Sequence, residues 1–189
     1  HSDSRRQRQM CIRDSPIILM GYYNLILYFG IEKFVKKCKE NGVDGLIIVD
    51  LQPEEDEDLI NELNNNQINL IRLITPTTDE ERLAKVLENS SGFLYYVSVT
   101  GITGTKKASI EDIEKSLNII KTLTKLPIAV GFGISTQKQI KEISNVANAA
   151  VVGSHIVKII ENEFSNNKTN LFNVEKVLKE VKTLSLGLN

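Results

Sequence analysis

The chain has few cysteines and few histidines, and this scarcity excludes several kinds of site. Among 189 residues there are two cysteines, Cys11 and Cys38, and two histidines, His1 and His155. Two cysteines supply neither a disulfide framework nor a set of metal ligands, so we expect a protein of the reducing cytoplasm. The spacing offers no Ser/His/Asp or Cys/His arrangement and no cluster of metal ligands. We therefore expect no metal ion.

The chain also lacks a charge bias and a long apolar segment. Its formal net charge is −1, with 25% charged and 41% hydrophobic residues, as in an ordinary globular domain. This balance does not favour nucleic acid or a membrane as a partner. The apolar stretch over residues 16–30 is interrupted by Gly21 and Asn24 and is too short to span a bilayer.

Residues 1–15 lack the apolar periodicity of the rest of the chain. They contain four arginines and almost no apolar side chain, and the apolar segment of a signal peptide is missing. We expect a non-homologous leader, disordered or artefactual, followed by one domain over residues 16–189.

From Pro16 onward, short apolar runs alternate with longer amphipathic segments. The runs are apolar throughout rather than at every second residue, which predicts strands of a parallel sheet with both faces covered. They cover residues 16–21, 45–50, 69–75, 92–98, 127–133 and 149–154.

The segments between these runs have helical spacing. Apolar residues share one face in 31–41, 110–123 and 173–184. We predict N-caps at Ser109 and Ser135 and a capping box of Thr78 with Glu81. Strand–helix repeats of this kind fit an α/β protein, either an open doubly wound sheet or a (β/α)8 barrel that lacks two strands.

Both architectures bind ligands at the carboxyl ends of their strands, and glycines cluster there. Gly131 and Gly133 end one strand and leave backbone N–H groups uncovered before a helix. Gly153 and Ser154 repeat this arrangement one strand later. Two neighbouring helix N-termini with bare amides predict a phosphate site. The alternative is that these glycines only turn the chain.

Three other features leave alternatives open. The loop 100–105, with Gly101 and Gly104 as candidate hinges, suits a lid or an ordinary connection. Asp50 at a strand end is a candidate catalytic carboxylate, whereas the acids after Pro53 are more simply a helix start. His155 is a candidate phosphate contact, although a surface position at a helix start explains it more simply.

Together these motifs resemble the tryptophan synthase alpha chain family. The matching segments follow the family's order and spacing, and the resemblance covers about residues 16–185. It implies an incomplete TIM barrel with about six parallel strands, strands 1 and 2 being absent. The segments are PIILMGYYN (16–24), GVDGLIIVDLQPEE (42–55), GFLYYVSVTGITG (92–104), VGFGIS (130–135) and VVGSHIVKII (151–160).

The resemblance implies a lyase of tryptophan biosynthesis. Such an enzyme cleaves indole-3-glycerol phosphate by a retro-aldol reaction to indole and glyceraldehyde 3-phosphate. It needs no cofactor in this subunit. Its partner would be the PLP-dependent tryptophan synthase beta chain in an alpha2beta2 complex, with the segments around Asp50, Pro53 and residues 22–24 facing that chain.

The resemblance also implies site residues. The phosphate would be held by Gly104, Gly131, Phe132, Gly133, Gly153 and Ser154. The indole pocket would be lined by Tyr95, Met20, Ile47, Val49 and Leu73. Thr103 and Gly101 would belong to the closing loop.

The chain also departs from the family. The family's acid/base glutamate and its assisting aspartate precede the segment that matches 16–24, and this chain has neither, so we expect it to be inactive. Gln52 stands where the family has proline, and His155 where it has a small residue. The alternatives are another phosphate-binding TIM-barrel enzyme of tryptophan or histidine biosynthesis, or a non-catalytic partner that activates a PLP-dependent beta subunit.

Overall fold

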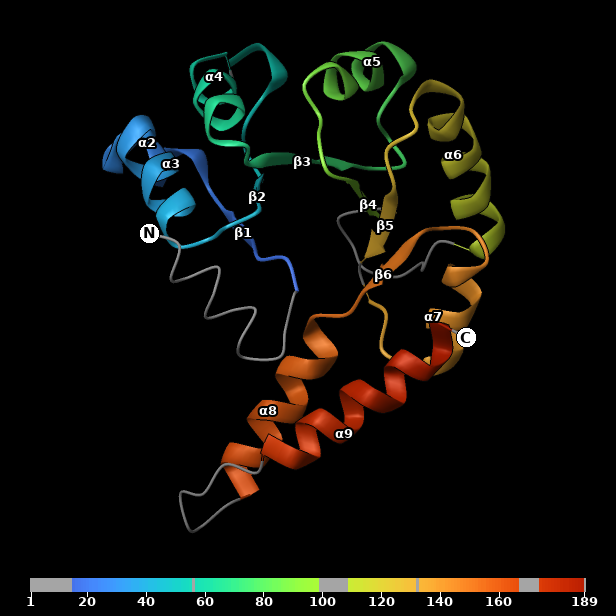
Figure 1. Ribbon diagram of the computed structural model, residues 1–189. Coiled ribbons are helices and arrows are strands. Elements are labelled where there is room, and N and C mark those ends of the chain that lie inside the picture. Colours follow the sequence, from blue (N-terminus) through green and yellow to red (C-terminus); the bar gives the residue numbers. More distant parts are fainter. Residues whose placement is uncertain (1–14, 56, 99–108, 132, 167–173, 189) are drawn as a thin grey trace. The chain divides into compact units, whose positions relative to one another are not determined.

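Figure 1 shows the chain as a computed structural model, which describes residues 15–55, 57–98, 109–131, 133–166 and 174–188. These residues form two compact units. Unit 1 takes the described residues up to Leu73 together with Asp79–Leu94, and unit 2 takes Ile74–Thr78 and the residues from Tyr95 onward.

Unit 1 contains three parallel strands and the helices that follow them. In the first strand pair Ile18 lies opposite Gly45, and in the second Gly45 lies opposite Asn69. The helices pack their apolar faces on the sheet, and Val35, Leu59 and Leu63 are almost fully buried there. The elements are β1 (Ile18–Gly21), α2 (Tyr23–Phe29), α3 (Ile31–Glu40), β2 (Gly45–Ile48), η1 (Pro53–Glu55), α4 (Glu57–Asn66), β3 (Asn69–Ile74, whose last residue belongs to unit 2) and α5 (Glu80–Glu88).

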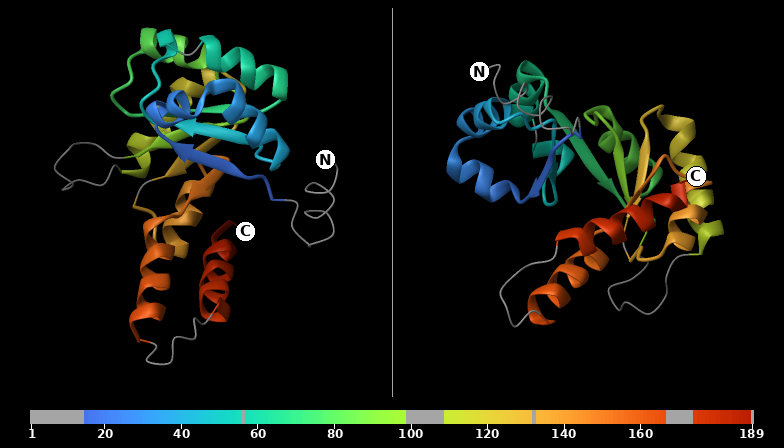
Figure 2. Two further views of the ribbon diagram at one scale, coloured as in Figure 1. Left: turned by 90° about the vertical axis from the view of Figure 1, so that its left-hand side faces the viewer. Right: turned by 60° about the horizontal axis from the view of Figure 1, so that its bottom comes forward.

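Unit 2 continues the alternation and ends in two long helices. β5 pairs with β6 in parallel, with Ala129 opposite Ala149. The views in Figure 2 show α8 and α9 side by side. The elements are β4 (Leu94–Val97, whose first residue belongs to unit 1), α6 (Ile110–Leu123), β5 (Ile128–Gly131), α7 (Gln137–Ser144), β6 (Ala149–Val151), α8 (Ser154–Asn166), α9 (Val174–Ser185) and η2 (Leu186–Leu188).

The order of the strands decides between the two predicted architectures. In the six-stranded sheet, the strands follow one another in chain order from β1 to β6. An open doubly wound sheet reverses its strand order near the middle, whereas a (β/α)8 barrel adds its strands in sequence. The fold is therefore an incomplete (β/α)8 barrel, and all six strands predicted from the sequence are confirmed.

The apolar runs also predict which strands are covered. β2 and β5 are buried along their whole length, as expected for strands packed on both faces. β1 and β6 are partly exposed, because they are the two ends of the strand order. Among the described residues, none of the helices is both long enough and apolar enough to cross a membrane.

The helix caps are partly as predicted. Ser109 caps α6 by accepting a hydrogen bond from the backbone N–H of Asp112. The predictions at Thr78 and Ser135 are each wrong by one residue. Asp79 caps α5, since the Thr78 hydroxyl is used in the preceding turn, where it accepts from the Thr75 N–H. Thr136 caps α7 in a reciprocal capping box with Gln139.

Candidate functional site

A pocket lies at the carboxyl ends of the strands of unit 2 and at the start of α8. Its volume is about 500 Å³. β4 contributes the tyrosine of its wall, the turn after β5 contributes three residues, and the end of β6 with the first turns of α8 contributes the rest. We call it the α8 pocket; it is lined by Tyr95, Gly133, Ile134, Ser135, Val151, Gly153, Ser154, His155 and Lys158.

Two glycines leave the backbone bare on the wall of the α8 pocket. A Cβ atom added at Gly133 or at Gly153 would meet no other atom within 4 Å. Gly133 also has a φ of 74°, which any residue with a side chain would adopt only with strain. Both positions can therefore present peptide N–H groups to a ligand without obstruction by a side chain.

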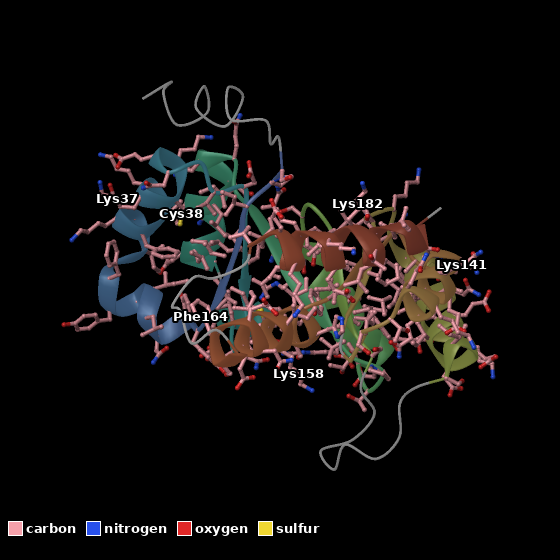
Figure 3. The ribbon with its side chains drawn as sticks, turned by 90° about the horizontal axis from the view of Figure 1, so that it is seen from below. Lys37, Cys38, Lys141, Lys158, Phe164 and Lys182 are labelled. Carbon is pink, nitrogen blue, oxygen red and sulfur yellow. The ribbon has the colours of Figure 1, made fainter. Side chains whose placement is uncertain are left out.

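The start of α8 adds positive potential to this wall. The helix begins at Ser154 and runs for 13 residues, so its N-terminal N–H groups carry the positive end of its dipole. Lys158, one turn further along and exposed, also lines this pocket and carries a positive charge. Figure 3 shows Lys158 on α8 and Lys182 on the neighbouring α9. Among the described residues that line it there is no aspartate or glutamate, so this part of the wall suits an anion.

Lys158 was not among the residues predicted from the sequence. Its spacing of four residues from Ser154 is the signal that identifies it, because residues four apart lie on one face of a helix. His155, for which the sequence leaves open a phosphate contact or a surface position, lines the α8 pocket.

Gly131 has a different neighbour. A Cβ added there would meet the phenol of Tyr95, with Cζ at 2.6 Å and Cε1 at 2.9 Å. The absence of a side chain at Gly131 thus makes room for the Tyr95 ring. Burial raises the pKa of the Tyr95 phenol, which keeps it protonated and able to donate a hydrogen bond.

The other predicted pocket residues that the structure describes belong to unit 1, and their role in an indole pocket stays a prediction. Met20 and Ile47 line a second pocket, of about 280 Å³, which belongs to unit 1 and is almost wholly apolar. Val49 is 41% exposed and Leu73 is half-buried, and neither is among the described residues that line this second pocket. Gly101, Thr103, Gly104 and Phe132 lie outside the described residues.

The acidic residues after β2 have structural partners. Asp50 accepts a hydrogen bond from the backbone N–H of Tyr23 at 2.7 Å, where α2 begins. Glu54 binds Arg82 through both carboxylate oxygens, at 3.0 and 3.2 Å. A hydrogen bond from its own backbone and the charge of Arg82 lower the pKa of Glu54. Gln52 accepts from the other terminal nitrogen of Arg82.

Arg72 supports the same loop from inside unit 1. It is 5% exposed within β3, and its guanidinium donates to the backbone oxygen of Leu51 at 3.1 Å. Burial, with a smaller contribution from the charge of Arg82, lowers the pKa of Arg72 to about 10. The loop after β2 is therefore held by two arginines.

Parallel strands in chain order, each followed by a helix, and a pocket at their carboxyl ends define the class of the protein, a (β/α)8-barrel protein with six of the eight strands. The family model described as "Tryptophan synthase alpha chain" matches residues 5–185. The chain belongs to this family. The match begins inside residues 1–15, and the division of the chain at that point stays a prediction.

Solved structures agree with this assignment. The tryptophan synthase subunit alpha from Campylobacter jejuni is 37% identical over 91% of this chain, with a TM-score of 0.78. A protein of Aquifex aeolicus VF5 is 33% identical over 98% of this chain, with a TM-score of 0.80. The tryptophan synthase subunit alpha from Legionella pneumophila str. Paris is 28% identical over 98%, with a TM-score of 0.78. This chain spans 66%, 66% and 65% of those chains, slightly less than two thirds.

Proposed function

We propose that this chain is the part of a tryptophan synthase alpha subunit that holds the phosphate end of indole-3-glycerol phosphate. The observation that carries the proposal is the α8 pocket, in which two bare glycines, a helix N-terminus and a lysine meet. A phosphate dianion there would accept hydrogen bonds from backbone N–H groups near Gly133, Gly153 and Ser154. The ammonium group of Lys158 would neutralise part of its charge.

The cleavage itself needs proton transfer at two places on the substrate. The indole ring gains a proton at C3, and the glycerol side chain loses a hydroxyl proton. Two carboxyl groups with separated pKa values suit these tasks. None of the described residues that line the α8 pocket is a carboxylate. We therefore expect the 189-residue chain alone to bind the phosphate group without cleaving the substrate.

Calorimetric titration with glycerol 3-phosphate tests the binding. The wild-type chain should show saturable binding. Gly153→Asp should weaken it at least about tenfold, because it places a negative charge and a side chain where the phosphate would lie. The matched control is Asn118→Asp, which adds the same charge to an exposed position of α6. Equal loss in both variants, or none in either, would contradict the proposed site.

Incubation of the purified chain with indole-3-glycerol phosphate tests the second part. Indole release should stay at the uncatalysed level. Steady release of indole would show that acid and base groups are present in this chain, and would refute its inactivity while leaving the phosphate site in place.

A partner is also part of the proposal. Leu25 and Tyr28 of α2 and Tyr22 just before it are 63%, 95% and 57% exposed and lie at or beside the segment expected to face a beta chain. Phe29 at the end of α2 packs edge-on against Phe34, with ring centroids 6.0 Å apart, which fixes α2 on α3. An exposed apolar face on a fixed helix suits a protein interface. We propose that it docks the tryptophan synthase beta chain, in the cytoplasm.

A further inference from the structure

The helix that carries the proposed docking face is too short to hold its position by itself. α2 has seven residues, and an isolated helix shorter than about 12–15 residues is only marginally stable in water. Its Ile26 is buried in the core, whereas Leu25 and Tyr28 are exposed. Among the described residues, Tyr22 occupies the N-cap position, and its side chain forms no capping hydrogen bond. Contacts from outside α2 therefore decide where the docking face lies.

The last turn of α2 is fixed by α3. Phe29 packs edge-on against Phe34, and the ammonium group of Lys33 lies 4.9 Å from the centre of the Phe29 ring. The backbone N–H of Gly30 donates to the carbonyl oxygen of Ile26 at 2.9 Å, which closes this turn. The start of α2 depends on a different segment.

Asp50 fixes the start of α2 from the neighbouring strand. Its Oδ1 atom accepts a hydrogen bond at 2.7 Å from the backbone N–H of Tyr23, the first residue of α2. The first N–H groups of a helix have no acceptor within the helix, so a carboxylate there acts as a cap and also meets the positive end of the dipole. Asp50 follows β2, whereas α2 follows β1, so the cap joins residues 27 apart in the chain.

Two arginines hold the loop that carries this cap. The buried Arg72 donates to the backbone oxygen of Leu51 at 3.1 Å. Arg82 of α5 contacts both carboxylate oxygens of Glu54, at 3.0 and 3.2 Å, and also donates to Gln52. A single exposed ion pair contributes little, but here several contacts from one loop converge on one guanidinium group. The loop after β2 is therefore a fixed support for the start of α2.

We propose that Asp50 is a positioning residue for partner docking, because it fixes the start of α2 and is itself held by the loop that Arg82 anchors. A displaced first turn would move the exposed side chains of Tyr22 and Leu25 relative to Tyr28. This inference deepens the proposed function, since it rests on the docking of a tryptophan synthase beta chain to α2. It also gives the carboxylate of Asp50 a role other than catalysis.

Amide hydrogen exchange of α2 tests the positioning without a partner. Asp50→Ala should speed exchange of the α2 amides about threefold to thirtyfold, the effect of losing one helix cap. Asp50→Asn should stay close to the wild type, because its amide oxygen can accept the same hydrogen bond. The matched control is Asp44→Ala, since Asp44 accepts from the backbone N–H of Ile17 at 2.8 Å, just before the opposite end of β1. It should leave the exchange of α2 unchanged.

Titration of each variant into a tryptophan synthase beta chain tests the docking role, with serine-plus-indole turnover as the signal. Asp50→Ala should raise the half-saturating concentration about threefold to thirtyfold. It should leave the turnover at saturation unchanged, because binding selects the correctly placed helix. Arg82→Met should raise the half-saturating concentration by a smaller factor. Its matched control is Lys85→Met, since Lys85 pairs with Glu81 within α5, and it should behave as the wild type.

Three results would overturn the inference. The first is unchanged exchange of α2 in Asp50→Ala, or an equal increase in Asp44→Ala. The second is faster exchange in Asp50→Ala with an unchanged half-saturating concentration, which would show that the cap does not serve docking. The third is an Asp50→Asn variant that docks as weakly as Asp50→Ala, because the charge of the carboxylate would then contact the partner directly.

Tyr28→Asp distinguishes this inference from the proposed function, because it changes the docking face and leaves the cap intact. If Tyr28→Asp docks as well as the wild type does, the docking face itself is wrong. If Tyr28→Asp loses docking but Asp50→Ala keeps the wild-type half-saturating concentration, the docking face stands and only the role of Asp50 fails.

Discussion

At the scale of single residues, a side chain is absent at the strand ends of unit 2 for two different physical reasons. Gly133 and Gly153 face open space, which is what a ligand needs if it is to reach the backbone. Gly131 instead faces the ring of Tyr95. In the sequence these three glycines look equivalent. The structure distinguishes them, because a side chain would meet open space at two of them and the Tyr95 ring at the third.

We therefore predict that Gly131→Ala destabilises the fold through a collision with the Tyr95 ring. The new Cβ would collide with the ring and should lower the free energy of unfolding by about 1–3 kcal/mol, the usual effect of overpacking. In a Tyr95→Ala background the ring is gone, so the same substitution should cost much less. Urea denaturation of the wild type and the three variants of this double-mutant cycle measures the difference.

Gly21→Ala is the control for this cycle. Gly21 also ends a strand, but a Cβ there would meet no atom within 4 Å. Its cost should stay within about 0.5 kcal/mol. An equal cost of Gly131→Ala with and without the Tyr95 ring would contradict the explanation.

At the scale of elements, the turn between β5 and α7 links the fold to the α8 pocket. It contains Gly133, Ile134 and Ser135, all of which line the pocket. The turn is fixed at its far end by the capping box of Thr136 and Gln139. Gln139 also accepts a hydrogen bond from the backbone N–H of Ser135 at 3.0 Å. The start of α7 thus holds part of the pocket wall.

Thr136→Ala should therefore affect both stability and binding. Loss of the cap should lower the free energy of unfolding by about 0.5–2 kcal/mol, and glycerol 3-phosphate should bind more weakly because the wall loses a support. Thr122→Ala is the matched control, since Thr122 is an exposed threonine of α6 that bonds only within its own helix. Urea denaturation and calorimetry measure the two effects. Unchanged stability in Thr136→Ala would show that the box is not formed.

The elements show how far the sequence determines the fold and the site. Continuous apolar runs predict all six strands, because burial on both faces leaves a direct signal in the sequence. The caps at Thr78 and Ser135 are each wrong by one residue, since neighbouring threonine, serine and aspartate side chains compete for the same N–H groups. The pairing of His155 with Glu180 joins residues 25 apart, and it depends on how α8 packs on α9. No local pattern carries that information.

At the scale of the whole molecule, the chain belongs to a family whose solved members are longer than it is. It spans 66% of the Campylobacter jejuni chain. Its own residues supply the α8 pocket in unit 2 and an exposed apolar face on α2 in unit 1. Phosphate binding and partner docking are therefore expected in different units of the chain.

This assignment predicts that docking can be removed without loss of the fold. Tyr28→Asp places a charge on the exposed face of α2 and should abolish any effect of the chain on serine-plus-indole turnover by a tryptophan synthase beta chain. The melting temperature should change little, because Tyr28 is 95% exposed. Ile119→Asp, at a 49% exposed position of α6, is the control and should keep the effect. Equal turnover with wild type and Tyr28→Asp would contradict the docking face.

A phosphate group in the α8 pocket would bind directly against bare backbone N–H groups. Nuclear magnetic resonance of the 15N-labelled chain, titrated with glycerol 3-phosphate and separately with glycerol, tests it most directly. We expect saturable shifts of the amide signals of Gly133, Gly153 and Ser154 with glycerol 3-phosphate and none with glycerol. Unchanged signals at these three residues, or equal shifts with the uncharged alcohol, would contradict it.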